Sequence, residues 1–233
     1  MACGLYGKLT AKRDFIAESV SRGFLDVFEP WLQGGISASR ITLGARWQAI
    51  YYAAPIWRFW LAPGYCGASV LGALMPSIDG VGRPFPLLLV ATAPPGQAFA
   101  PPQADPREDW FASVEDLLLS TLEEGRDFES VLADLHGLPE PATILPPQPP
   151  EGLHLLADGT LRVTATEPAE GLLKVLARLD QGADHAQWGR GCVFWTLGGQ
   201  DIPAQALVGL KLPAVEQFAG LMNGVFETIR PQT

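Results

Sequence analysis

The segment 139–150 places the strongest single constraint on how this chain can fold. Six of its twelve residues are proline. Proline has no backbone N–H and its ring clashes with the preceding helical turn, so neither a helix nor a central strand can run through this segment. We therefore predict a semi-rigid linker at 139–150, which separates a first domain of residues 1–138 from a smaller C-terminal α/β subdomain of residues 151–233 packed on it.

Composition and charge narrow the setting of the protein and its partners. The chain has 233 residues, a formal net charge of −9 and three widely spaced cysteines. Nucleic acids and anionic membranes reward clustered Lys and Arg, so neither is expected as a partner. Residues 1–15 carry charged side chains where a secretory signal needs an apolar run, and the cysteines form no CxxC pair. We expect a cytoplasmic protein without membrane insertion, and the sequence leaves its oligomeric state open.

The spacing of apolar residues predicts the order of elements in the first domain. In chain order we expect strands at 3–9 and 14–16, a helix from Ser21, strands at 56–61, 68–75 and 85–92, a helix capped by Asp109 and a helix that Asp127 starts. Pro30 and the Gly34-Gly35 pair fall inside the first helix, where we expect a kink or break. This order matches the longin or SNARE-like type of α+β fold, an antiparallel five-stranded sheet with helices on both faces.

In the C-terminal part, the spacing of apolar residues again predicts both strands and helices. We expect strands at 161–166, 192–196 and 206–210, a helix that follows Pro168 and buries leucines between 172 and 179, and a closing helix from 215 to 225.

Polar side chains gather on the loop between the second and third of the 56–92 strands, where Ser77, Asp79 and Arg83 lie. One interpretation is an Arg-centred recognition loop, because a guanidinium suits carboxylate or phosphate ligands. In the other, Asp79 and Arg83 tie the hairpin together while Ser77 or Asp79 bonds the turn backbone. We favour this structural interpretation, since polar loop residues mostly satisfy backbone groups.

Trp57 and Arg58 are neighbours in an expected strand, so their side chains point to opposite faces of the sheet. Core packing is the expected role for most of the seven tryptophans. A surface that carries Trp and Arg would alternatively be a good protein-binding hot spot.

Lys8 lies in a stretch that superficially suggests a phosphate-binding loop. That motif needs four residues between its glycines and a Ser or Thr directly after the lysine. Here two residues separate Gly4 from Gly7, and Leu9 follows Lys8. We interpret the stretch as a tight strand and turn.

Catalytic motifs are missing from the sequence. The three histidines, His136, His154 and His185, form no HxxxH or HxE pattern, and no GxSxG occurs. We expect a protein that is not an enzyme and that uses no cofactor and no metal.

Short stretches in a fixed order over residues 4–89 match one known family. They are Gly4–Leu9, Asp14-Phe15, Trp31–Gln33, Ser39-Arg40, Leu43-Gly44, Pro55–Phe59, Leu61–Gly64, Cys66-Gly67, Gly72, Met75–Asp79, Val81–Arg83 and Phe85–Leu87. Together they resemble the TagF family, also called ImpM, of proteins associated with bacterial type VI secretion. The chain departs from the family's usual pattern at Thr10, Arg13, Gly80 and Pro84, and two of these positions lie in the polar loop.

The resemblance implies a non-enzymatic, post-translational repressor of type VI secretion that binds the system's forkhead-associated scaffold protein. The candidate partner surface combines the residues singled out above: Lys8, Asp14, Trp57, Arg58, Ser77, Asp79 and Arg83. The alternative is a small-molecule or nucleotide-responsive sensor or enzyme, in which Lys8, Arg58, Asp79 and Arg83 gather around one pocket.

Overall fold

A computed structural model describes residues 3–145, 153–155, 161–163, 191–199 and 201–226. The strands are β1 (Cys3–Gly7), β2 (Ile16–Glu18), β3 (Trp57–Leu61), β4 (Val70–Met75), β5 (Leu87–Thr92), β6 (Leu153–Leu155), β7 (Leu161–Val163), β8 (Cys192–Thr196) and β9 (Gln205–Gly209). The helices are α1 (Arg22–Leu43), α2 (Trp47–Ala53), α3 (Glu108–Ser120), α4 (Phe128–Gly137) and α7 (Phe218–Asn223), with short 3-10 helices η1 (Gly44–Arg46) and η2 (Val215–Gln217).

The main sheet has seven strands in the order β2-β1-β5-β4-β3-β8-β9, and every neighbouring pair is antiparallel. The prediction of an antiparallel sheet is confirmed, but the prediction of five strands is wrong. The two additional strands come from the C-terminal part, because β8 pairs with the outer edge of β3 and β9 pairs with β8. This sheet therefore joins both sides of the proline-rich segment.

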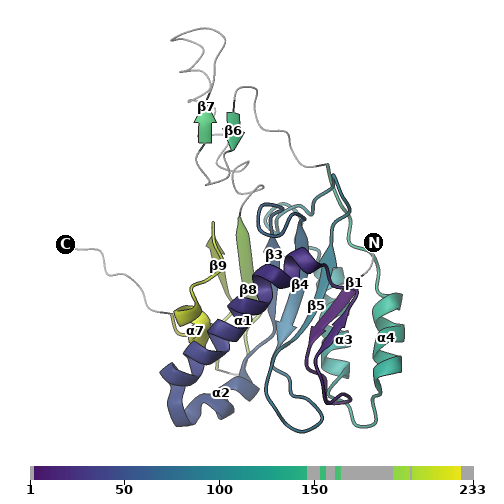
Figure 1. Ribbon diagram of the computed structural model, residues 1–233, viewed down its shortest axis with the longest axis vertical. Coiled ribbons are helices and arrows are strands. Elements are labelled where there is room, and N and C mark those ends of the chain that lie inside the picture. The colour runs from purple at the N-terminus through teal and green to yellow at the C-terminus, as the bar shows by residue number, and fades with distance from the viewer. Residues whose placement is uncertain (1–2, 146–152, 156–160, 164–190, 200, 227–233) are drawn as a thin grey trace, which may run out of the picture.

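Helix α1 covers one face of the sheet (Figure 1). The start predicted at Ser21 is confirmed, and Ser21 caps the helix by accepting a hydrogen bond from the Phe24 backbone N–H at 3.3 Å. The predicted break is wrong, since α1 runs unbroken through Pro30. Gly34 and Gly35 instead allow a close approach, because a Cβ at Gly35 would overlap the Phe218 ring.

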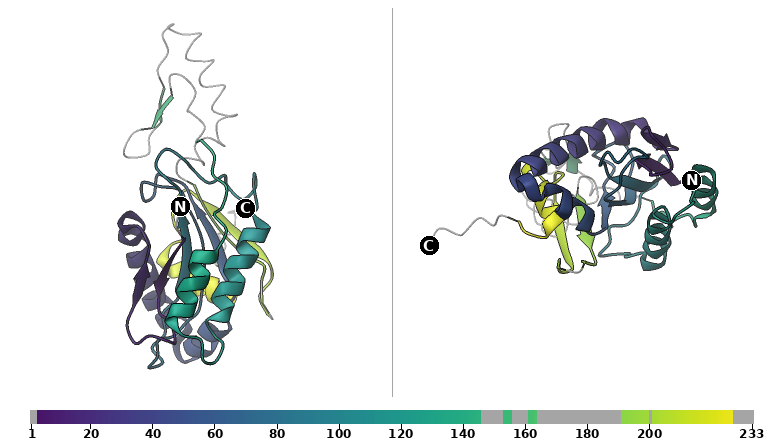
Figure 2. Two further views of the ribbon diagram at one scale, coloured as in Figure 1. Left: turned by 90° about the vertical axis from the view of Figure 1, so that its right-hand side faces the viewer. Right: turned by 90° about the horizontal axis from the view of Figure 1, so that it is seen from below.

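Helices α3 and α4 lie on the opposite face (Figure 2), where they close a second apolar layer. Asp127 caps α4 by accepting from the Ser130 N–H at 2.8 Å, which confirms that prediction. The cap predicted at Asp109 is wrong by two residues, because Arg107 occupies the cap position in a left-handed conformation with φ 51° and Asp109 lies inside the helix. The apolar spacing that predicts α3 also includes Leu122, but this residue lies beyond the helix and is exposed.

Some of the elements predicted in the C-terminal part can be compared with the structure, and one lies outside the described residues. Strand β8 matches its predicted range, and β9 lies one residue earlier than predicted. Strand β7 covers the first half of the strand predicted at 161–166. The helix predicted after Pro168 lies outside the described residues. Among the helices that are described, none is long and apolar enough to cross a membrane.

Candidate functional site

Asp79 is the centre of the polar loop between β4 and β5. Its side chain is fully buried, and its Oδ1 accepts from the backbone N–H groups of Val81 at 3.1 Å and Arg83 at 2.9 Å. Its Oδ2 lies 2.6 Å from Arg83 Nε and 3.0 Å from Lys8 Nζ. This geometry confirms the structural interpretation, in which Asp79 and Arg83 tie the loop together and Asp79 bonds the turn backbone.

The same contacts keep the Asp79 carboxylate charged. Burial alone would raise the pKa of this carboxyl, but hydrogen bonds from the Arg83 backbone, from the Lys8 and Arg83 side chains and from the Val81 backbone outweigh burial. The pKa is therefore held well below its ordinary value. Asp79 forms ion pairs with two cations at once, so its main role in this fold is to hold the loop.

A second loop, residues 8–15, is bound to this one. Arg83 Nη2 donates to the Arg13 carbonyl oxygen at 2.7 Å, and the Gly80 N–H donates to the Lys12 carbonyl oxygen at 2.7 Å. Lys8 is buried beneath this contact and also donates to the Arg83 carbonyl oxygen at 3.4 Å. The N-terminal strand–turn predicted around Lys8 and the polar loop therefore form one unit.

Ser77 anchors the base of the loop through its backbone. Its N–H donates to the Tyr51 hydroxyl at 3.0 Å, and this hydroxyl donates to the Ser77 carbonyl oxygen at 2.9 Å. Both residues are buried. Tyr51 was missed in the sequence, because nothing local connects residue 51 on α2 with residue 77.

What this unit exposes is a small surface made of Asp14, Phe15, Val81 and Arg83, which we call the Arg83 surface. The Arg83 side chain is 61% exposed, and Phe15 and Val81 are 51% and 58% exposed. The Phe15 ring packs edge-on against Phe85 with centroids 4.8 Å apart. Of the candidate residues, Arg83 and Asp14 reach solvent here, while Lys8, Ser77 and Asp79 support the surface from beneath.

Trp57 does not belong to a surface. It is 1% exposed, and its indole Nε1 donates to the Leu221 carbonyl oxygen at 2.6 Å. The hot-spot interpretation is therefore corrected to the core role, because α7 and the ring of Phe226 cover this end of β3.

Arg58 points to the other face of β3 and is 2% exposed beneath α3. Its Nε and Nη2 donate to the Glu115 carboxylate at 2.6 and 3.1 Å, and its Nη1 donates to Glu108 at 2.6 Å. Burial lowers the pKa of Arg58, but the hydrogen bonds to Glu115 and Glu108 outweigh burial and raise it. Arg58 is thus held by α3, apart from Lys8, Asp79 and Arg83, and does not join them around one pocket.

The two partners of Arg58 could have been found in the sequence. Glu108 and Glu115 are seven residues apart, so they lie two turns apart on one face of a helix. This spacing inside an otherwise apolar helix face indicates a buried cation opposite. Among the described residues, no group of three or more His, Cys, Asp or Glu side chains could hold a metal ion.

Comparison with known proteins shows the family of this chain. Residues 4–138 match the TagF N-terminal domain, described as type VI secretion system-associated. The chain belongs to the TagF family. The matched range contains both loops of the Arg83 surface and ends immediately before Pro139.

A solved structure supports the assignment over the whole TagF chain. It is the crystal structure of PA0076 from Pseudomonas aeruginosa PAO1, which is 31% identical in sequence. The match covers 100% of this chain and 99% of the other with a TM-score of 0.77, so this TagF-family fold includes the C-terminal part. No curated protein matches the chain.

Proposed function

We propose that this chain is a non-enzymatic, post-translational repressor of type VI secretion that acts by binding the system's forkhead-associated scaffold protein. The observation that carries the proposal is membership of a family described as type VI secretion system-associated, over residues 4–138. Repression would be stoichiometric, because a ligand that binds one state of the scaffold better than another shifts the population toward it without chemistry.

The contact with the scaffold is proposed at the Arg83 surface. Binding hot spots are enriched in Arg and aromatic residues, and this surface presents Arg83 beside the half-exposed Phe15 ring. Its position is fixed from below by the buried Asp79, so little conformational entropy is lost when a partner binds.

We further propose that the five contiguous strands β2-β1-β5-β4-β3, with α1 on one face and α3 and α4 on the other, form a longin-like unit. The order of elements and the helices on both faces support this relation. The cytoplasmic location is proposed on the same family grounds.

Secretion in culture tests the role. Export of the secretion tube protein should rise when the gene is deleted and fall when the chain is overexpressed, with transcript levels unchanged. Unchanged export in both strains would refute the repressor role.

Binding to purified scaffold tests the surface, with Val81→Glu as the probe. This change adds a charge to the Arg83 surface while the Val81 backbone N–H, which bonds Asp79, stays in place. We expect binding to weaken by roughly tenfold or more. Ile41→Glu is the matched control, because Ile41 is also an exposed β-branched residue but lies on α1. Equal binding by both variants would exclude the Arg83 surface as the contact.

A further inference from the structure

The Arg83 guanidinium is held in place through two of its nitrogens. Its Nε donates to Asp79 Oδ2 at 2.6 Å, and its Nη2 donates to the Arg13 carbonyl oxygen at 2.7 Å. Within the described residues Nη1 makes no hydrogen bond or ion pair, and the side chain is 61% exposed. Because a guanidinium carries its N–H donors in one rigid plane, the two donors on Nη1 have a fixed direction before any partner binds.

Positive charge is in excess on the two loops that build the Arg83 surface. Residues 8–15 and 76–86 contain four cationic and two anionic side chains, which gives a net charge of +2 in a chain whose total is −9. One of the anions, Asp79, pairs with both Lys8 and Arg83, so this trio keeps one net positive charge. The loops therefore differ in sign from the chain as a whole.

The exposed cations of these loops outnumber the exposed anions. The cations are Lys12, Arg13 and Arg83, and the anion is Asp14. Lys12 is turned toward α4, where its Nζ lies 4.2 Å from the centroid of the Phe128 ring. Arg13 and Arg83 are joined through the Arg13 carbonyl oxygen, so two arginines lie side by side. Their charge favours an anionic partner.

Half-exposed apolar side chains belong to the same surface. Phe15 is 51% exposed and Val81 is 58% exposed, and the Phe15 ring is held edge-on against Phe85. A free inorganic anion would gain nothing from these groups. A peptide segment in which Asp or Glu stands beside an apolar residue would contact both the arginines and the apolar side chains. The surface thus fits an acidic segment of a protein better than a small anion.

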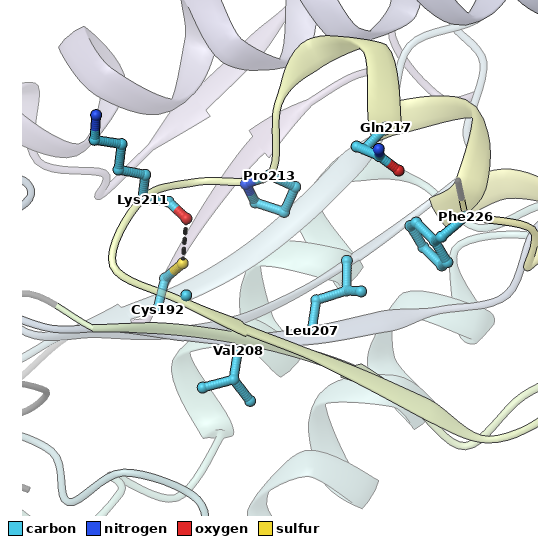
Figure 3. Close-up of a pocket in the computed structure, with 8 residues that line it drawn as sticks. Cys192, Leu207, Val208, Lys211, Pro213, Gln217 and Phe226 are labelled. Atoms are coloured by element: carbon cyan, nitrogen blue, oxygen red, sulfur yellow. Dashed lines mark hydrogen bonds between the residues drawn. The ribbon is translucent and has the colours of Figure 1, made fainter. Parts of the chain in front are cut away.

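The hollow beside β9 lacks this combination. It has a volume of about 270 Å³ and lies between β9 and the segment that leads into α7. Its charged lining residue, Lys211, directs its ammonium group away from Leu207 and Phe226, and the Lys211 carbonyl oxygen accepts from Cys192 Sγ at 2.9 Å (Figure 3). This hollow suits an apolar group and would not orient a carboxylate.

We propose that the Arg83 surface binds a segment of the scaffold in which an acidic side chain stands next to an apolar one. This inference rests on the proposed function, because it names the chemistry that the scaffold presents to this surface. The carboxylate accepts from Arg83 Nη1, and the apolar side chain packs against Phe15 and Val81. Since Asp79 and Arg13 already hold Arg83, the arginine loses little freedom when the segment binds.

Two substitutions of Val81 test the charge of the partner through the affinity of the full chain for purified scaffold. Val81→Glu and Val81→Lys remove the same apolar side chain and differ in the sign of the charge that they add. We expect Val81→Lys to bind roughly tenfold or more tightly than Val81→Glu. The same two changes at Ile41, an exposed position on α1, are the control and should give equal affinities. Circular dichroism establishes that all four variants are folded.

Asp14→Lys is a second test, because it replaces the exposed anion of these loops by a cation. It should tighten scaffold binding by roughly two- to fivefold, an effect that a merely structural role would not produce. Equal affinities of the two Val81 variants, tighter binding by Val81→Glu or weaker binding by Asp14→Lys overturns this inference and leaves the repressor role in place. If the wild-type chain does not bind the scaffold at all, the proposed function fails and this inference fails with it.

Discussion

Asp79 shows how a single buried carboxylate can organise a surface that it does not reach. Four donors from two loops surround it, and two of them are the charged side-chain groups of Lys8 and Arg83. If the carboxylate were removed, Lys8 would remain buried without its counter-charge, which is strongly unfavourable. The shape of the Arg83 surface therefore depends on the ionisation of Asp79.

This dependence predicts how stability changes with pH. Because the folded pKa of Asp79 lies below its unfolded value, its contribution is fully present at neutral pH and is lost as the pH falls below about 4. Asp79→Asn should lower the urea midpoint at pH 7, and the gap from wild type should narrow toward pH 3. Asp14→Asn, which changes an exposed carboxyl on the neighbouring loop, should have little effect at either pH. A gap for Asp79→Asn that is the same at both pH values would contradict this account.

At the residue scale, the sequence predicts which side chains are chemically distinctive better than it predicts where they lie. Alternation correctly sends Trp57 and Arg58 to opposite faces of β3. It does not reveal that both faces are covered, because the covering segments, α3 and α7, are about 50 and 160 residues away along the chain. The Asp79–Arg83 pair was predictable because it is local, only four residues apart.

Among the elements, α1 illustrates how packing overrides propensity. Pro30 and the Gly34-Gly35 pair should weaken this helix, and yet it forms 22 unbroken residues. Its apolar stripe, which includes Phe24, Phe28 and Trp31, packs on the sheet and on α7, and this burial stabilises the helix. Local rules predicted where α1 starts and missed its continuity.

The adjacent glycines Gly34 and Gly35 of α1 should respond differently to alanine. Gly→Ala in a helix gains about 1 kcal/mol of propensity. At Gly35 the added Cβ overlaps the Phe218 ring, and we expect net destabilisation by about 1–3 kcal/mol. Gly34→Ala is the control, because its Cβ meets only the Val215 side chain, with Cγ1 at 3.1 Å, and the loss should be smaller or reversed. Thermal or urea unfolding measures both, and equal effects would contradict the close packing of α1 on α7.

For the whole molecule, the sheet crosses the boundary that the proline-rich segment suggested. The ranges of β8 and β9 were predictable from their own apolar residues, but their pairing was not. Contact between β3 and β8 joins Arg58 to Trp195, and a pattern within either segment carries no information about the other. A five-stranded count follows directly from treating the first 138 residues alone.

This arrangement predicts that residues 1–138 are not sufficient for a stable fold. Without the C-terminal part, β3 loses its β8 neighbour, and Trp57 and Phe59 lose the cover of Phe194 and Phe218. We expect the fragment to be poorly soluble or to lack a cooperative thermal transition, whereas the full chain shows one. Co-expression of residues 139–233 should restore the folded state. A monodisperse 1–138 fragment with a sharp transition would show that the first part folds alone.

Because β3 pairs with β8, its edge can be covered only after β8 has been synthesised. The partner of Arg58, Trp195, leaves the ribosome 137 residues later. At roughly 5–20 residues per second, β3 waits on the order of 10 s with an open edge and uncovered aromatic rings. During each round of translation the nascent chain thus resembles an aggregation-prone intermediate, so its yield in the cell should depend on chaperones that hold emerging chains and on the speed of elongation between codons 61 and 192.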